Sequence, residues 1–541
     1  MKKIISLFLC VTMVLSCTAV SAFAENENLI VFTSGIGQSN INSEENKDLI
    51  VFVTGIGQSY TYLFDRKYLE EGIFENGTLH DYENYTFLIE NNQYSERWNL
   101  IYNLGNAFKN PVFVADLGLL VAQIVISCVF GKRLYSGALK NAVSEWLKYN
   151  TIDESGKLPE NVITPQYPCP LSEYPYHIDE NGNKKSNAKD RFYSSIPCAE
   201  VAKEKLGEDY ENYFYCFNYS SFSYTSDNVK ALHDFIETIL KNNKVGANRV
   251  VLVPMSMGAS VVSAYLNEYP DVSENHVGKV VSIVGCWNGS DLVTDLLNCD
   301  YVDNSQEMFY ETLLPGYLNN MIGKPYGTLI MLFLRLLPKA ELRAFIDEVL
   351  GSIDNLILST PSLLALVPSY DYESIRDRIP EGKVRDEADK YYNCQITLKE
   401  RMEELEKQGV TFSFISAYGS TFGEITDEYN IMKFFASSDD TNSDEIINIS
   451  STAPGTSYVA YDKVFEDETN RILSPDKSID ISTTWYKDST WFICKEMHDL
   501  KHNKNALSLA VDLATGKIKT VYDCDSTEDE LYYPQFSSVA A

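Results

Sequence analysis

The stretch VVLVPMSMGASVVSAYLNEYP, residues 250–270, predicts a buried strand, a sharp turn and a helix. Its first part is apolar and β-branched, as in a buried strand, and the pattern from Ser260 to Tyr269 has helical spacing. Ser256 lies at the turn between them. This arrangement is typical of a nucleophile elbow, a strained turn that exposes a serine hydroxyl at the start of a helix. The alternative is a structural serine at a strand end.

The turn departs from the usual GxSxG pattern of such an elbow. Pro254 occupies the position of the first glycine, whereas Gly258 keeps the second. We expect glycine to be required at 258 because the helix passes close to the strand there and leaves no room for a side chain. Pro254 is acceptable where the strand ends, since its ring only fixes φ at about −65°. The pattern therefore favours Ser256 as a nucleophile.

A Gly-rich segment occurs twice near the amino terminus, as LIVFTSGIGQS from Leu29 and as LIVFVTGIGQS from Leu49. Each copy predicts a buried strand that leads into a glycine turn. We interpret the pair as a local duplication in which one copy is functional, preferably the second. The backbone N–H of Ile56 would then form an oxyanion hole together with that of Met257, which follows the serine. The alternatives are the first copy, with Ile36 as donor, or a purely structural turn.

Other parts of the chain predict an alternation of strands and helices. Further buried strands are expected at 213–219, 279–285 and 410–419, and a helix is expected at 228–243. This order predicts parallel βαβ units and an α/β sheet that is covered on both faces. The segment LSLAVDLATGKIKTVY is expected to form a hairpin that turns at Thr515-Gly516.

The amino terminus has the features of a signal peptide. Two lysines precede the apolar run 4–14, and a small-residue cleavage site ends at Ala24. We therefore expect residues 1–24 to be removed and the protein to be secreted or held at the cell surface. The alternative is a lipoprotein site that leaves a lipid-anchored Cys17.

No low-complexity linker divides the rest of the chain, so we expect one elaborated α/β domain at 25–525 and a C-terminal tail at 526–541. Two long insertions, at about 60–205 and 291–400, interrupt the strand–helix alternation. They contain the apolar runs at 117–130 and 328–338. We interpret these runs as buried helices of a cap, or as lid helices over an acyl-binding groove, and not as membrane spans.

The chain is strongly acidic, with a formal net charge of −31, or −33 once residues 1–24 and their two lysines are removed. Such a charge repels phosphate backbones and anionic lipid surfaces, so we expect no nucleic-acid partner. The nine cysteines beyond residue 24 are scattered, include no CxxC pair and do not predict a disulfide scaffold. Their pairing stays open.

Taken in order, these motifs resemble the lecithin:cholesterol acyltransferase family, which includes phospholipid:diacylglycerol acyltransferases and bacterial lipase-like relatives. The matching segments are TGIGQS (54–59), FNYSSFSYTSDNVKALHDFI (217–236), MSMG (255–258), VVSIVGCWNGSD (280–291), TPSLLALVPSYDY (360–372) and FISAYGS (414–420). The resemblance implies an α/β-hydrolase fold with a mostly parallel central sheet, helices on both faces and long cap or lid insertions. It also implies a catalytic triad in the order serine, acid, histidine.

The candidates for the acid follow the strand at 410–419: Asp439, Asp440 and Asp444. We expect Asp444 to be the acid because it stands where the family has an Asp-Gly-x-Val signature. Asp440, Asn442 and Asp444 also have the spacing of an EF-hand calcium loop. Glu445 and Ser451, however, occupy positions where that loop requires glycine and glutamate. A solvated acidic loop without chemistry is the remaining alternative.

Only two histidines, His498 and His502, lie after Asp444 in the chain. His498 follows the apolar run TWFIC by four residues, as expected of a loop that leaves a buried strand. His502 lies between Lys501 and Lys504, which indicates a solvent-facing position. We therefore expect His498 to be the general base. The alternatives are two surface histidines or a metal-binding pair, which would lack an apparent third ligand; we expect no metal and no cofactor.

The predicted function is that of a secreted serine hydrolase, a lipase or esterase or an O-acyltransferase, that acts on lipid-like acyl esters. Ser256 would form the acyl-enzyme, His498 would transfer the proton and Asp444 would orient the imidazole. We expect a lipid or ester substrate and transient contact with a lipid surface, and leave the oligomeric state open. The alternative is a non-catalytic extracellular binding protein on a hydrolase scaffold. It is motivated by Pro254 and by Ser220-Ser221-Phe222, which replaces the family's Asp-Trp-Arg.

Overall fold

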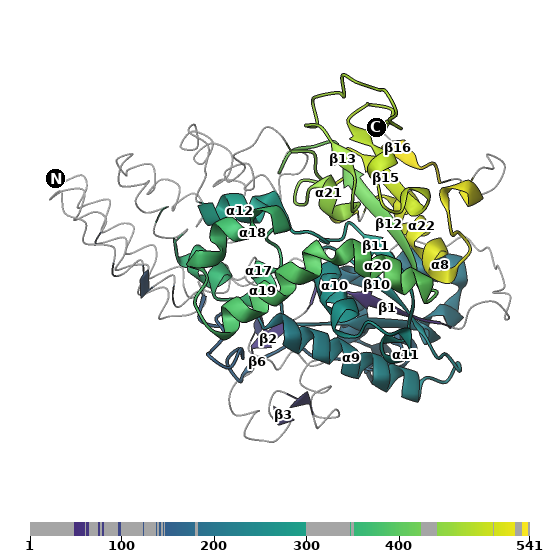
Figure 1. Cartoon of the computed structure of the whole chain (residues 1–541). Helices are drawn as coiled ribbons and strands as arrows, with labels where there is room; N and C mark the ends of the chain where they lie inside the picture. Colours follow the sequence, from purple (N-terminus) through teal and green to yellow (C-terminus); the bar gives the residue numbers. More distant parts are fainter. Residues whose placement is uncertain are drawn as a thin grey trace, which may run out of the picture.

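The computed structural model describes most of the chain. The described residues are 48–59, scattered positions between 61 and 146, 147–178, 182–298, residue 347, 351–423, 441–500, 502–524 and 533–538 (Figure 1). The expected signal peptide, the first Gly-rich copy and, apart from Gln123, the apolar runs at 117–130 and 328–338 lie outside these residues. None of the described helices is both long enough and apolar enough to cross a lipid bilayer.

A seven-stranded sheet forms the centre of the molecule. In spatial order its strands are β16 (Phe536–Ser538), β15 (Thr490–Cys494), β12 (Thr411–Tyr418), β11 (Val277–Ile283), β10 (Val250–Pro254), β1 (Leu49–Val53) and β9 (Phe214–Phe217). Every neighbouring pair of strands is parallel. All residues of β1, β9 and β10 are buried, which explains why these strands are unbroken apolar runs in the sequence. The predicted α/β class is confirmed.

Helices cover both faces of this sheet, as predicted. One face carries α9 (Thr225–Asn242), α10 (Gly258–Glu268), α19 (Lys383–Ile396) and α20 (Leu398–Lys407). The other face carries α8 (Ala199–Leu206) and α22 (Lys504–Thr515), which lie side by side although they are far apart in the sequence (Figure 1). Successive side chains of a strand point to opposite faces. Val51 therefore packs with the first group of helices and Ile50 with the second.

Shorter elements surround this core. The small antiparallel sheets pair β2 (Thr61–Leu63) with β5 (Glu96–Trp98) and β6 (Val162–Ile163), β3 (Phe74–Glu75) with β4 (Thr78–Leu79), β7 (His177–Ile178) with β8 (Lys184–Lys185), and β13 (Ser457–Tyr458) with β14 (Ile479–Asp480). The shorter helices are α7 (Asn187–Ser195), α11 (Val272–Asn275), α12 (Asp291–Asn298), α17 (Pro361–Leu364), α18 (Ser369–Ile375) and α21 (Ile449–Thr452). Helices α8 and α19 lie within the ranges expected as insertions, yet both help to cover the sheet.

The hairpin expected around Thr515-Gly516 is wrong, because the segment forms helix α22. The side chain of Asn503 accepts a hydrogen bond from the N–H of Ala506 at the start of this helix, and Gly516 ends it in the left-handed conformation (φ 80°). The helix is buried between the sheet and α8, so apolar residues occur on most of its sides. Its sequence therefore lacks a one-sided helical pattern and resembles the alternation of a strand.

The expected C-terminal tail contributes a strand to the sheet. Phe536 pairs with Phe492 of β15, and the two rings are stacked with their centroids 5.3 Å apart. Within the described residues, β16 is thereby the edge strand beside β15. Residues 536–538 of the expected tail therefore form part of the central sheet.

Candidate active site

The turn at Ser256 is strained in the way an elbow requires. Ser256 lies two residues after the end of β10 and has a φ of 52°, a left-handed conformation that L-residues rarely adopt. Its N–H donates to the carbonyl of Ile283 (3.3 Å), and its carbonyl accepts from the N–H of Cys286 (2.8 Å) and of Ala259 (3.1 Å). The end of β11 and the first turn of α10 therefore hold the backbone of Ser256 in this conformation.

Two glycines allow the backbone to approach closely around this turn. A Cβ at Gly258 would lie 2.2 Å from the carbonyl oxygen of Val53, so α10 passes β1 with no room for a side chain. A Cβ at Gly55 would lie 2.8 Å from the Cβ of Ser256. The reason given for glycine at 258 is confirmed, and the second Gly-rich loop lies directly beside the serine.

The structure brings Ser256, His498 and Asp444 together. The hydroxyl of Ser256 lies 2.9 Å from Nε2 of His498, and Nδ1 of His498 lies 2.7 Å from Oδ2 of Asp444. The three residues follow β10, β15 and β12 respectively, so they meet at the carboxyl edge of the parallel sheet. All three are buried, and Asp444 has no exposed surface at all. His502, by contrast, is exposed.

The loop that carries Asp444 is built to hold the carboxylate in place. Oδ1 accepts hydrogen bonds from the backbone N–H groups of Ile446 (3.1 Å) and Ile447 (2.8 Å), while Oδ2 faces His498. Asn442 ties the loop to the end of β12 by accepting from the N–H of Gly419 (2.8 Å). Asp439 and Asp440, the other candidates for the acid, lie outside the described residues.

Two opposing effects act on the pKa of His498. Burial by itself lowers the pKa, because an imidazolium loses its hydration. The carboxylate of Asp444 raises it through both its charge and its hydrogen bond, and this effect prevails, so the pKa lies above the ordinary histidine value. The arrangement stabilises the imidazolium that would form when His498 takes a proton from Ser256.

The two expected oxyanion donors belong to segments that lie beside Ser256. Met257 follows it in the chain, and Ile56 follows Gly55, which packs against it. Within the described residues, neither the N–H of Ile56 nor that of Met257 has a hydrogen-bond partner. Met257 is buried, whereas Ile56 is 36% exposed. Two unpaired N–H groups near a serine hydroxyl suit the stabilisation of a negatively charged oxygen.

Gln58 is a residue of this site that the sequence analysis missed. Its Oε1 accepts from the N–H of Gly55 (2.6 Å), and its Nε2 donates to Sδ of Met255 (3.1 Å). Gln58 therefore links the Gly-rich loop to the residue that precedes Ser256. A signal was present in the sequence, since both copies of GIGQS contain this glutamine.

Searches with this chain against models of protein families and against curated proteins found no match. The function is therefore inferred from the geometry of the site and from the motifs in the sequence.

Among the described residues, no group of three or more histidine, cysteine, aspartate or glutamate side chains is placed to hold a metal ion.

Proposed function

We propose that the protein is a serine hydrolase of the α/β-hydrolase type, which cleaves or transfers acyl esters through an acyl-enzyme. The observation that carries the proposal is the hydrogen-bonded series Ser256–His498–Asp444 at the carboxyl edge of the sheet. The left-handed φ of Ser256 supports it, because strained backbone of this kind is found at nucleophile elbows.

In the proposed mechanism, Oγ of Ser256 attacks the ester carbonyl while Nε2 of His498 accepts the hydroxyl proton. The carbonyl oxygen becomes negatively charged, and the N–H groups of Met257 and Ile56 stabilise it. When the carbon–oxygen bond to the leaving alcohol breaks, His498 returns the proton to that alcohol. Water or another alcohol then attacks the acyl-enzyme and gives its proton to His498. The bond between the acyl carbon and Oγ of Ser256 breaks, and His498 returns the proton to Oγ. Asp444 keeps the imidazole oriented and stabilises its charged form throughout.

The substrates we propose are neutral or zwitterionic lipid-like esters. The resemblance to the lecithin:cholesterol acyltransferase family supports this class, and membership of that family is part of the proposal. The net charge of −31 disfavours anionic lipid surfaces. We further propose that the protein is exported and that water is its usual acyl acceptor, since an exported enzyme meets abundant water.

Covalent labelling of the purified protein by a fluorophosphonate tests the proposed nucleophile. We expect stoichiometric labelling, with the adduct located by mass spectrometry on the peptide that contains Ser256, because only an activated serine reacts readily with this probe. Ser256→Ala should remove the adduct. If the folded wild-type protein is not labelled, the non-catalytic binding protein becomes the better explanation.

The pH dependence of ester hydrolysis follows from the raised pKa of His498. His498 accepts a proton only in its neutral form, so kcat/KM should fall as the pH decreases through the pKa of the folded protein. That pKa lies above the ordinary value of about 6.5. We therefore expect the acid limb of the profile, measured with a p-nitrophenyl ester, to have its midpoint above pH 6.5.

Asp444→Asn provides the control for this profile. Removal of the carboxylate leaves burial as the dominant effect on His498, so the midpoint should move to lower pH. The plateau rate should also fall, by roughly 10⁴-fold, because the imidazole loses the partner that orients it. A midpoint that does not move would show that another group determines the acid limb.

Gln58→Ala should lower kcat by roughly 10- to 100-fold while KM changes little. The substitution removes the acceptor for the N–H of Gly55 and the contact with Met255, and thereby releases the loop that carries Ile56. A hydrogen bond of this kind contributes about 1–3 kcal/mol when its loss leaves a buried partner unpaired. Steady-state kinetics on a soluble ester measures the effect.

A matched control is Gln408→Ala. Gln408 also accepts from a backbone N–H, that of Val272 (2.9 Å), and donates to a carbonyl, that of Pro270 (3.1 Å). It is exposed, and its partners lie beyond the carboxyl end of α10, whereas Ser256 precedes the amino end of that helix. We expect its kcat to equal that of the wild type. Equal losses of kcat in both variants would indicate a general effect on folding instead of a role for Gln58 in positioning the loop.

A further inference from the structure

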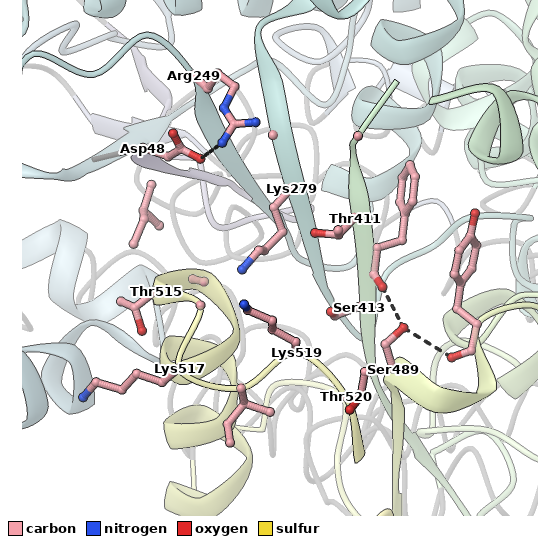
Figure 2. Close-up of a pocket in the computed structure, with 18 of the residues that line it drawn as sticks. Asp48, Arg249, Lys279, Thr411, Ser413, Ser489, Thr515, Lys517, Lys519 and Thr520 are labelled. Atoms are coloured by element: carbon pink, nitrogen blue, oxygen red, sulfur yellow. Dashed lines mark hydrogen bonds and ion pairs between the residues drawn. The ribbon is translucent and has the colours of Figure 1, made fainter. Parts of the chain in front are cut away.

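A cavity lies at the end of the sheet opposite Ser256. It has a volume of about 1470 Å³ and is lined by residues at or just before the amino ends of the strands, including Asp48, Arg249, Lys279, Thr411 and Ser489 (Figure 2). Since all strands of the central sheet are parallel, the length of the strands separates these residues, at the amino ends, from the candidate active site at the carboxyl ends. The cavity is therefore a distinct site.

The charge of this cavity is opposite to that of the protein as a whole. Asp and Glu outnumber Lys and Arg by 76 to 45 in the chain, whereas basic residues outnumber acidic ones in the cavity lining. Arg249 is paired with Asp48 (3.3 Å). Among the described residues, neither the ammonium of Lys279 nor that of Lys519 forms an ion pair with a carboxylate, although Asp523 accepts a hydrogen bond from the backbone N–H of Lys519 (2.9 Å). The ammonium of Lys279 instead donates to the carbonyl of Leu513 (2.7 Å).

The two lysines face one another across the cavity. Figure 2 shows their amino groups turned toward each other, one from β11 and one from the loop that follows α22. The pKa of Lys279 is lowered to about 8, mainly by burial; the charge of Asp48 opposes this shift, and the positive charges of Lys519 and Arg249 contribute to it. The two ammonium groups repel one another, and Asp48, the carboxylate that acts on Lys279, is already paired with Arg249. An anion between them would relieve this repulsion.

Hydroxyl groups complete the polar surface beside Lys279. Lys279 is in register with Thr411 on the neighbouring strand β12, and Ser413 lies two residues further on, so the three side chains share one face of the sheet. Figure 2 shows Thr411 and Ser413 on the side of β12 that faces the cavity. Neither hydroxyl has a hydrogen-bond partner among the residues that the structure describes. Ser413 is nevertheless 96% removed from solvent, with an exposed fraction of 4%.

We propose that this cavity binds an organic anion through a phosphate- or carboxylate-type oxyanion group held between Lys279 and Lys519. The ammonium groups would donate charge-assisted hydrogen bonds to its oxygens, and the hydroxyls of Thr411 and Ser413 would donate neutral ones. The lining also contains aromatic residues, among them Tyr213 and Trp485, which would pack against the less polar part of the ligand. The volume is large enough for a drug-sized ligand and exceeds that of a single inorganic ion.

Isothermal titration of the full chain with sulfate and with citrate, at constant ionic strength, tests the site. Sulfate represents a tetrahedral oxyanion and citrate a polycarboxylate. The probe that binds more tightly therefore indicates the chemical class of the head group. We expect saturable binding of at least one probe at low millimolar concentration or better. Lys279→Gln and Lys519→Gln should each weaken binding of the probe by roughly tenfold or more, because each substitution removes one positive charge that would contact the head group.

Lys241→Gln is the matched control, since Lys241 is an exposed lysine on α9 and its loss changes the net charge equally. Its affinity for either probe should equal that of the wild type. Lys519 is exposed, so Lys519→Gln should fold even if Lys279→Gln does not. The proposal is overturned if the wild type shows no saturable binding below about 10 mM. It is also overturned if the folded lysine variants bind as the wild type does.

The pH dependence of sulfate binding gives an independent readout. Sulfate keeps its double charge between about pH 7 and 9.5, whereas Lys279, with a pKa of about 8, loses its charge over this range. Binding to the wild type should therefore weaken by roughly tenfold as the pH rises. The variant Lys279→Gln should lack this change, and a wild type without it would contradict the assignment of Lys279.

Discussion

His498→Ala is expected to lower kcat/KM for ester hydrolysis by roughly 10⁴-fold or more. The imidazole is the sole group in contact with Oγ of Ser256 that is placed to take its proton, among the residues that the structure describes. Without it, Ser256 stays a weakly nucleophilic alcohol at neutral pH. The same variant should lose fluorophosphonate labelling, because that reaction also needs an activated serine.

His502→Ala is the matched control for this experiment. His502 lies four residues further along the chain, is exposed and is not hydrogen-bonded to Ser256 or Asp444. We expect its kcat/KM to stay within a few-fold of the wild type. Loss of activity in His502→Ala with an active His498→Ala would reassign the general base. If both variants are fully active, the proposed triad does not carry the reaction.

Gly258→Ala is expected to destabilise the fold by about 3 kcal/mol or more, or to prevent folding altogether. The added Cβ would lie 2.2 Å from the carbonyl oxygen of Val53 and 2.8 Å from that of Thr54. Both contacts are with the backbone at the end of a central strand, which cannot move aside as a flexible side chain could. Helix α10 would therefore have to shift away from β1, and with it the turn that carries Ser256. Chemical denaturation monitored by circular dichroism measures the change.

Gly351→Ala is the control, because it replaces a helical glycine without creating a steric clash. Gly351 is also helical, and an added Cβ there would meet no atom within 4 Å. Because alanine has the higher helix propensity, we expect this variant to be unchanged or more stable by up to about 1 kcal/mol. A Gly258→Ala protein as stable as Gly351→Ala would mean that α10 and β1 are not packed as closely as described.

Most of the central fold could be predicted from the sequence because parallel strands are buried on both faces. β9 and β10 are unbroken apolar runs, and β11 and β12 are mostly apolar, so each of the four was located to within a few residues. Helix α9 was equally clear, since most of its apolar side chains are buried and most of its polar ones are at least partly exposed. Helix α22 lacks this contrast because it is covered on nearly every side, and it was therefore mistaken for strands.

Other features depend on contacts that no local pattern contains. Phe536 belongs to the sheet because its ring stacks on Phe492, forty-four residues earlier in the chain. Gln58 positions the Gly-rich loop because Met255 lies within reach of its amide, although almost two hundred residues separate them. Neither role is visible in the sequence around the residue itself.

The sequence by itself determined the α/β class and the turn at Ser256, because both depend on short-range spacing, whereas the order serine, acid, histidine was implied by the family resemblance. Which side chains meet was decided only by the tertiary structure. The parallel sheet places the carboxyl ends of β10, β12 and β15 at one edge. There, residues separated by up to 242 positions come within hydrogen-bond distance, as His498 and Ser256 do at 2.9 Å. The same sheet places Lys279 at its opposite edge beside Lys519, because a parallel strand begins where its neighbours begin.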